Sequence, residues 1–203
     1  MIDRRKNWNT ISLGRALIDQ TVPILRSLPV PVAILLVQLH APPRLGATLR
    51  LVHDTACQLV EWLQLNYAAA SVDAAAVLFG AAIHDVGKAL HPEELSEPGS
   101  AHVEAGYRLL VANGVSADLA RFTRTHMDWD ERSELEDLLV CLAGKVWKAE
   151  RMPELEQLVT RRLSTACDVE PWQVFLDLND ELTRIAADAD RRLAFQARYA
   201  ITT

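Results

Sequence analysis

The chain has few cysteines and no long apolar run. Its 203 residues include only Cys57, Cys141 and Cys167, which are widely spaced and form no CxxC pair. This pattern argues against a disulfide framework and against a cysteine-based zinc site, and it suits a reducing compartment. The most apolar stretch, residues 32–39, is too short for a membrane-spanning helix, which needs about 20 residues.

An excess of basic residues is also missing. The chain has 21 Lys and Arg against 27 Asp and Glu, which gives a formal net charge of −6. Proteins that bind the nucleic-acid backbone normally carry a basic face, so nucleic acid is not expected as a partner. The N-terminus lacks the apolar run and cleavage site of a signal peptide. We therefore expect a cytoplasmic protein with no membrane partner. A small anionic substrate is compatible with the charge, because a local cation is enough to bind it.

Helical periodicity is what the chain does have. Apolar residues recur at intervals of three and four, and no segment shows the alternation typical of a strand, so we predict an all-helical fold. The predicted helices span residues 45–65, 73–85, 101–113, 116–126 and 133–150. Ser133 and Glu136 have the spacing of a capping box at the start of the last of these. Two further helices follow Pro153, with Pro171 in a first turn.

Four histidines lie on the apolar faces of four consecutive predicted helices. These are His53, His84, His102 and His126, and each is expected to point towards the interior. A single such histidine is readily explained as a core residue bonded to a backbone carbonyl. Four together favour a metal site, because imidazole offers a neutral nitrogen donor near pH 7. Asp85, next to His84, can supply the negative charge that a hard divalent ion requires.

The segments around these histidines resemble the motifs of a known family. AAIHDVGKA, which contains His84, Asp85 and Lys88, resembles the signature of the HD-domain (HDIG-type) metal-dependent phosphohydrolases. LRLVHDTACQLVEWL resembles the first-histidine helix of that superfamily and contains His53. AHVEAGYRLL and TRTHMDWD resemble its next two histidine motifs, with His102 and His126. The motifs occur in the family's order over roughly residues 41–150.

The resemblance implies a compact helical bundle. Residues 41–150 would form the HD domain, residues 1–40 an N-terminal extension with a short helix, and residues 151–203 helices that pack on the domain. It also implies one or two divalent ions, with Mn, Fe, Mg, Co and Zn all open.

The metal ligands implied by the resemblance fall into two sets that share Asp85. His53, His84 and Asp85 would hold one ion, and Asp85, His102 and His126 would hold the other. Together they would activate a water molecule for attack on a small phosphorylated, nucleotide-like substrate. Lys88 would neutralise a phosphate oxygen, although a solvent-exposed lysine at a helix end is the alternative.

Three arginines are further candidates for binding phosphate. Arg44, Arg50 and Arg124 could each do so, because a guanidinium group matches the geometry of a phosphate. Ordinary surface charges are the alternative for each of them.

One position departs from the family pattern. The final ligand of the superfamily is an aspartate late in a helix, but the corresponding segment here is CLAGKVWKAER, with Gly144 at that position. Asp137 and Cys141 lie one or two turns earlier on roughly the same face. Two alternatives stay open beside a phosphohydrolase. One is a non-catalytic HD domain that binds a ligand or partner, which Gly144 motivates. The other is a di-iron oxygenase of the HD fold, because some HD-fold oxidases resemble the same order of histidines and aspartate.

Overall fold

The computed structural model describes residues 12–201, and in these residues the chain is all-helical with no strand, as the periodicity predicts. A first helix covers residues 12–18. The longer helices that follow are α2 (Val30–Gln38), α3 (Pro43–Asn66), α4 (Ala74–Ile83), α5 (Ala101–Ala112), α8 (Leu135–Val146), α9 (Pro153–Cys167), α10 (Pro171–Ala186) and α11 (Ala189–Ala197). The short helices are α6 (Ala117–Ala120), α7 (Phe122–Thr125), η1 (Ala68–Ala70), η2 (Val86–Ala89) and η3 (Pro92–Leu95).

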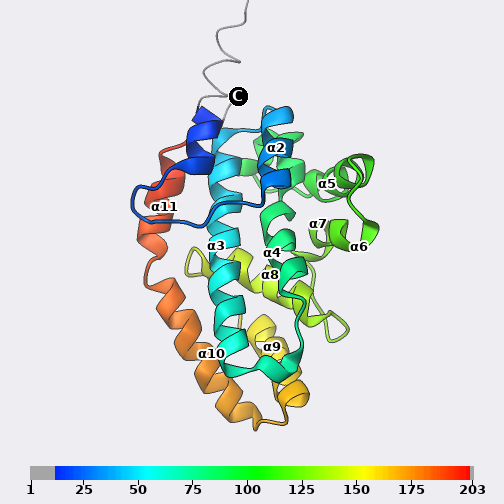
Figure 1. Ribbon diagram of the computed structural model, residues 1–203, viewed down its shortest axis with the longest axis vertical. Coiled ribbons are helices and arrows are strands. Elements are labelled where there is room, and N and C mark those ends of the chain that lie inside the picture. Colours follow the sequence, from blue (N-terminus) through cyan, green and yellow to red (C-terminus); the bar gives the residue numbers. More distant parts are fainter. Residues whose placement is uncertain (1–11, 202–203) are drawn as a thin grey trace, which may run out of the picture.

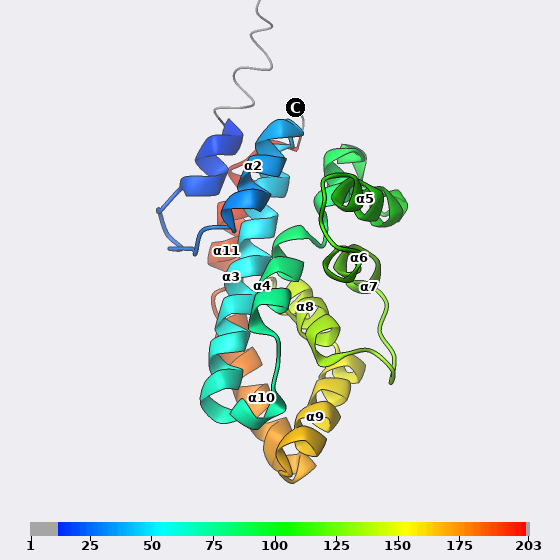
Figure 2. The same ribbon diagram turned by 45° about the vertical axis from the view of Figure 1, so that its right-hand side comes forward.

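Helix α3 is the central element of the bundle. It packs against α4 and α8 on one side and contacts α10 and α11 on another (Figures 1 and 2). It begins at Pro43, where a missing N–H costs nothing because the first turn has no intrahelical acceptor for it. Most of its residues between Leu45 and Val60 are buried, so α3 reads as a core helix rather than a surface one.

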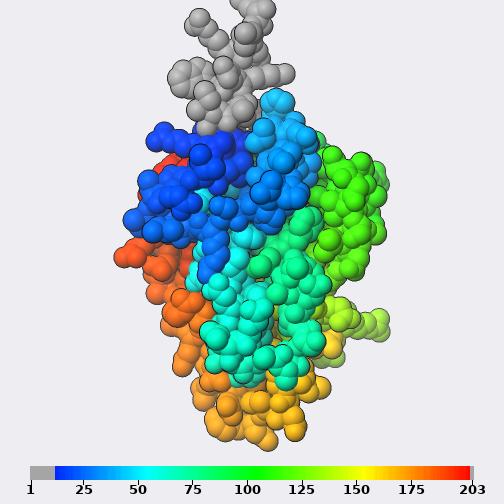
Figure 3. Space-filling view, viewed as in Figure 1, coloured from blue at the N-terminus to red at the C-terminus, as the bar shows by residue number. Residues whose placement is uncertain are grey.

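The N-terminal segment is bound to α3 by a buried arginine. The side chain of Arg50 is completely buried, and its guanidinium donates to the carbonyl oxygens of Ala16, Asp19, Leu25 and Arg26 at 2.7 to 3.3 Å. Residues in the N-terminal part of the chain, blue in Figure 3, therefore cover the upper end of α3. The donors of Arg50 are used for this contact, so it does not serve as the phosphate ligand that the sequence suggested.

Three local predictions are wrong. From Pro153 onwards the chain forms the three helices α9, α10 and α11, where two were expected. The helix predicted over residues 116–126 is divided into α6 and α7 at Arg121, where the Thr123 hydroxyl donates to the Ala120 carbonyl at 3.0 Å and competes with the helical pattern. The predicted capping box is absent: Ser133 bonds to Asp130, while the carboxylate of Glu136 accepts from the backbone N–H of Asp73. Helix α8 accordingly begins at Leu135 and ends at Val146.

In the part of the chain that the structure describes, no helix combines the length and the apolar character needed to cross a membrane.

Candidate metal centre

The HD dipeptide lies where α4 ends. His84 is the C-terminal cap of that helix, and Asp85 follows it before the short helix η2. His126 occupies the equivalent position, as the cap of α7. The last carbonyl groups of a helix have no intrahelical donor, so they are free to accept a hydrogen bond from a side chain.

Both capping histidines use such a carbonyl. The Nδ1 atom of His84 lies 2.9 Å from the Ala81 oxygen, and the Nδ1 atom of His126 lies 2.9 Å from the Thr123 oxygen. A carbonyl oxygen can only accept, so Nδ1 must carry the proton in each ring. In the neutral imidazole the lone pair is then on Nε2, which is the atom that can bind a metal ion.

The third ring is fixed by a carboxylate. His102 is the second residue of α5, and its Nδ1 donates to Oε2 of Glu94 in η3. The same reasoning leaves the lone pair of His102 on Nε2. Sequence reasoning missed Glu94, because nothing in the segment LHPEELSEPGS indicates which of its carboxylates folds back onto α5.

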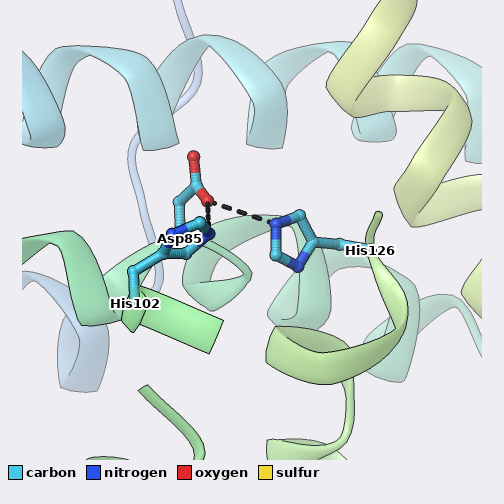
Figure 4. A group of neighbouring side chains, drawn as sticks. All are labelled: Asp85, His102 and His126. Carbon is cyan, nitrogen blue, oxygen red and sulfur yellow. Dashed lines mark ion pairs between the residues drawn. The ribbon is translucent and has the colours of Figure 1, made fainter. Parts of the chain in front are cut away.

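The three Nε2 atoms converge on Asp85. One carboxylate oxygen, Oδ1, lies 3.2 Å from Nε2 of His102 and 3.3 Å from Nε2 of His126 (Figure 4). The other, Oδ2, lies 3.6 Å from Nε2 of His84 and 2.8 Å from Nζ of Lys88. All four of the predicted residues His84, Asp85, His102 and His126 are at least 92% buried.

This arrangement fits a cation. Oδ1 of Asp85 and Nε2 of His102 are both buried, and neither has a hydrogen-bond partner. Two unpaired acceptors that face each other in a low-dielectric interior are costly. A divalent ion between them would remove that cost, and candidate ligand atoms of Asp85, His102 and His126 lie within 4.8 Å of one another. The donor set of two imidazoles and a carboxylate suits a transition-metal ion or zinc.

Comparison with known families agrees with this geometry. The sequence model of the HD domain family matches residues 50–193, which is more than half of the chain. The chain belongs to the HD domain family. Comparison with curated proteins and with solved structures gave no match. The matched range extends past residue 150, although the boundaries proposed at residues 40 and 150 remain predictions.

The first-motif histidine of this HD domain lies on the central helix α3. His53 is buried on α3, and its Nδ1 lies 3.9 Å from Sγ of Cys57 in the next turn. It is not among the three residues whose ligand atoms cluster. Its role as a metal ligand stays a prediction, as do the ligand roles of His84, Asp85, His102 and His126.

Asp137, the nearby candidate to replace the missing late ligand, is engaged elsewhere. Asp137 is buried in the first turn of α8, and it accepts from Oγ1 of Thr125 at 2.6 Å and from Nε of Arg121 at 3.2 Å. Cys141, one turn later, donates to the Thr125 carbonyl. Both residues therefore fasten α8 to the helix that carries His126. Gly144 continues the same face, and a Cβ atom built on it would meet nothing within 4 Å.

The remaining arginine candidates are also engaged elsewhere. Arg44 donates to the backbone oxygen of Tyr199 at 3.0 Å, near the C-terminal end of the described chain. Arg124 pairs with Glu104 at 2.7 Å and lies over the ring of Tyr107. Lys88 is different, because its contact with Asp85 places a cation directly at the centre, with 19% of its side chain exposed.

The electrostatics of the centre keep Asp85 charged. Burial tends to raise the pKa of Asp85, but its electrostatic interactions with His84, His102 and His126 outweigh burial and hold the pKa well below its usual value. Burial lowers the pKa of His84 to about 4, and it lowers that of His53 to about 4 as well. Burial also tends to lower the pKa of His102, but the carboxylates of Asp85 and Glu94 more than offset it, so this pKa is raised.

We expect the metal-free protein to lose stability between pH 6.5 and pH 5. Over this range the unfolded state protonates His53 and His84, whereas the folded state keeps them neutral because their pKa values are about 4. The unfolded state then binds more protons than the folded state. The free energy of unfolding therefore decreases as the pH is lowered from 6.5 to 5, by roughly 2 kcal/mol per imidazole. The raised pKa of His102 adds no slope here, because its stabilising contribution is fully present below its unfolded value.

Urea unfolding in the presence of a chelator, at several pH values, measures this slope. The His53→Gln variant removes one of the two groups and should lose about half of it. A free energy of unfolding that is constant from pH 6.5 to pH 5 would contradict the assignment.

Glycines of two motifs bring the helices of the site together. A Cβ atom on Gly87 would overlap the backbone oxygen of His102 and lie 2.7 Å from the backbone nitrogen of Gly106. Gly87→Ala should therefore push α5 away from η2, lower the stability by about 3 kcal/mol and weaken metal binding. Gly106→Ala is the matched control, since its Cβ would stay at least 3.1 Å from Gly87. Thermal unfolding of both variants checks this, and equal losses would contradict it.

Proposed function

We propose that this protein is a metal-dependent phosphohydrolase that acts on a small phosphomonoester or nucleotide. The observation that carries the proposal is the set of three Nε2 atoms, each with its tautomer fixed by an acceptor, arranged around the charged carboxylate of Asp85. Membership of the HD domain family supports the same reaction type. The acidic chain, with its net charge of −6, supports a small substrate in place of a nucleic acid.

Asp85, His102 and His126 would hold one divalent ion, and His53, His84 and Asp85 would hold a second where one binds. An ion held in this way supplies Lewis-acid polarisation of a phosphoryl oxygen and acidifies a water molecule. Asp85 would be shared by both ion positions, because its two carboxylate oxygens lie near the Nε2 atoms of His84, His102 and His126. Lys88 would bind a phosphate oxygen, since its ammonium group is partly exposed and lies 2.8 Å from Oδ2 of Asp85. Its charge would also balance part of the charge of the substrate.

Metal analysis of the purified protein, followed by a phosphatase panel, tests the proposal. We expect one or two equivalents of Mn, Fe, Co or Zn per chain, and release of phosphate from small phosphomonoesters or nucleotides. Redox-active iron with oxygen uptake and no phosphate release would instead indicate a di-iron oxygenase.

A non-catalytic HD domain is the second candidate, and one observation favours it. Gly144 stands where the resemblance places a ligand, so the position of His53, His84 and Asp85 has one carboxylate fewer than the family pattern. A protein that binds no metal and releases no phosphate would support this candidate.

A further inference from the structure

Glu94 holds an unusual position next to the metal centre. Its carboxylate lies at the start of α5, where Oε1 accepts from the Ala101 N–H at 2.9 Å and Oε2 accepts from the His102 N–H at 3.1 Å. Oε2 also accepts from Nδ1 of His102. The residue in the N-cap position, Ser100, makes no side-chain bond of this kind. Glu94 therefore caps α5 from seven and eight residues upstream, through the backbone N–H groups of Ala101 and of the ligand histidine His102.

The loop between η3 and α5 is built to admit this carboxylate. A Cβ atom on Gly99 would overlap Oε1 of Glu94, so a larger residue there would displace the side chain. Only 8% of the Glu94 side chain is exposed, which keeps water from competing for its oxygen atoms. The turn residue, the buried carboxylate and the start of α5 thus form one unit.

Glu94 also makes His102 chemically different from its two neighbours. The Nδ1 atoms of His84 and His126 face neutral carbonyl oxygens, whereas that of His102 faces a carboxylate. A carboxylate that accepts from Nδ1 fixes the ring orientation and makes Nε2 a stronger electron-pair donor to a metal ion. That nitrogen, Nε2, is the one that lies 3.2 Å from Oδ1 of Asp85 without a hydrogen-bond partner.

We propose that Glu94 is a positioning residue of the metal centre. It fixes His102 as an Nε2 ligand and adds a negative charge at the Nδ1 side of the ring, away from the ion. The inference rests on the metal centre of the proposed function. It also bears on Gly144, because a carboxylate behind His102 would strengthen the Asp85, His102 and His126 position in a chain that lacks the late aspartate. The two ion positions should then differ in affinity.

Titration of the metal-free full chain with Co²⁺ tests this inference, since its visible absorption reports both affinity and ligand geometry. Glu94→Gln keeps an acceptor for the ring but removes the charge, and Glu94→Ala removes both. We expect Co²⁺ affinity to fall about 10–100-fold in Glu94→Ala and by less in Glu94→Gln. This is the range found when the hydrogen-bond partner of a metal-binding histidine is removed in other metalloproteins. The absorption of the bound ion should also change in Glu94→Ala.

A matched control separates positioning from helix capping. Glu156 is another buried carboxylate at a helix start, where it accepts from the backbone N–H of Met152 and pairs with Arg151, remote from the centre. Glu156→Gln and Glu156→Ala should leave Co²⁺ affinity within about twofold of the parent, because neither touches a ligand.

Histidine ¹⁵N spectra of the metal-free protein at pH 8 provide a second readout. They should show the Nδ1–H form of His102 in the parent and a mixture of tautomers in Glu94→Ala. A Glu94→Ala protein with parental Co²⁺ affinity overturns the role of Glu94 but leaves the metal centre and the proposed hydrolysis intact. Equal losses in the Glu94 and Glu156 variants overturn it as well. A parent that binds no Co²⁺ overturns both this inference and the proposed function.

Discussion

Replacing Asp85 with asparagine is expected to abolish divalent-metal binding and, with it, any release of phosphate. Asp85 is the residue on which the Nε2 atoms of His84, His102 and His126 converge, and it supplies the carboxylate of the candidate ligand cluster among the described residues. The substitution preserves the shape of the side chain and removes its charge. Removing a hydrogen-bond partner of a metal ligand typically lowers metal affinity by about 10–100-fold. Removing the charge of the shared ligand itself should therefore lower metal affinity by more than about 100-fold.

Metal content by mass spectrometry and phosphate release measure these two effects, and circular dichroism checks that the helices remain. Asp85→Ala and His84→Ala should behave in the same way, with a stability loss of about 1–2 kcal/mol apart from any contribution of the bound ion. Glu156→Gln serves again as a buried carboxylate outside the centre. Activity that survives in Asp85→Asn would show that Asp85 is not the shared ligand.

The sequence predicted the helices that carry the site because each has a strong apolar face. The helix expected over residues 45–65 is observed as Pro43–Asn66, and the one expected over 101–113 as Ala101–Ala112. The inward direction of the histidines followed from the same periodicity, and all four are buried. Which of them meet is a different question, since it depends on how helices cross. The structure brings His84, His102 and His126 to Asp85. The apolar helix faces and the family resemblance together predicted that these residues meet in one pocket with His53, and for His53 this stays a prediction.

The features that could not be predicted depend on long-range contacts of polar side chains. Arg50 resembles a surface cation in the sequence, yet it is buried because the carbonyl groups of the N-terminal segment satisfy its donors. Glu136 has the spacing of a capping residue, yet its carboxylate binds the Asp73 N–H, 63 residues away. In both cases the polar side chain is satisfied by backbone groups of a segment that is distant in the sequence. Intrinsic preferences are weak enough for such contacts to override them.

A second ion should bind when the missing late ligand is restored. Gly144→Asp would place a carboxylate on the face of α8 that also carries Asp137 and Cys141, and a Cβ atom there meets nothing within 4 Å. The His53, His84 and Asp85 position shares its only carboxylate, Asp85, with the other position, so two divalent ions would be balanced by a single ligand carboxylate. The added carboxylate should raise metal stoichiometry from about one to about two per chain, as in two-metal sites, and should increase the rate of phosphate release.

Gly144→Ala is the control that isolates the ligand effect. Both substitutions remove a glycine from a helix interior, which costs about 1 kcal/mol relative to alanine, so the alanine variant should gain most of that stability. Only the aspartate variant should gain metal, because only it adds an oxygen ligand and a charge. Metal analysis at equal protein concentration compares the two directly. If both variants bind as much metal as the parent, Gly144 does not face the ion. The centre would then work as a single-ion site, in which Asp85, His102 and His126 form the complete protein ligand set and the charge of Glu94 behind His102 supports it.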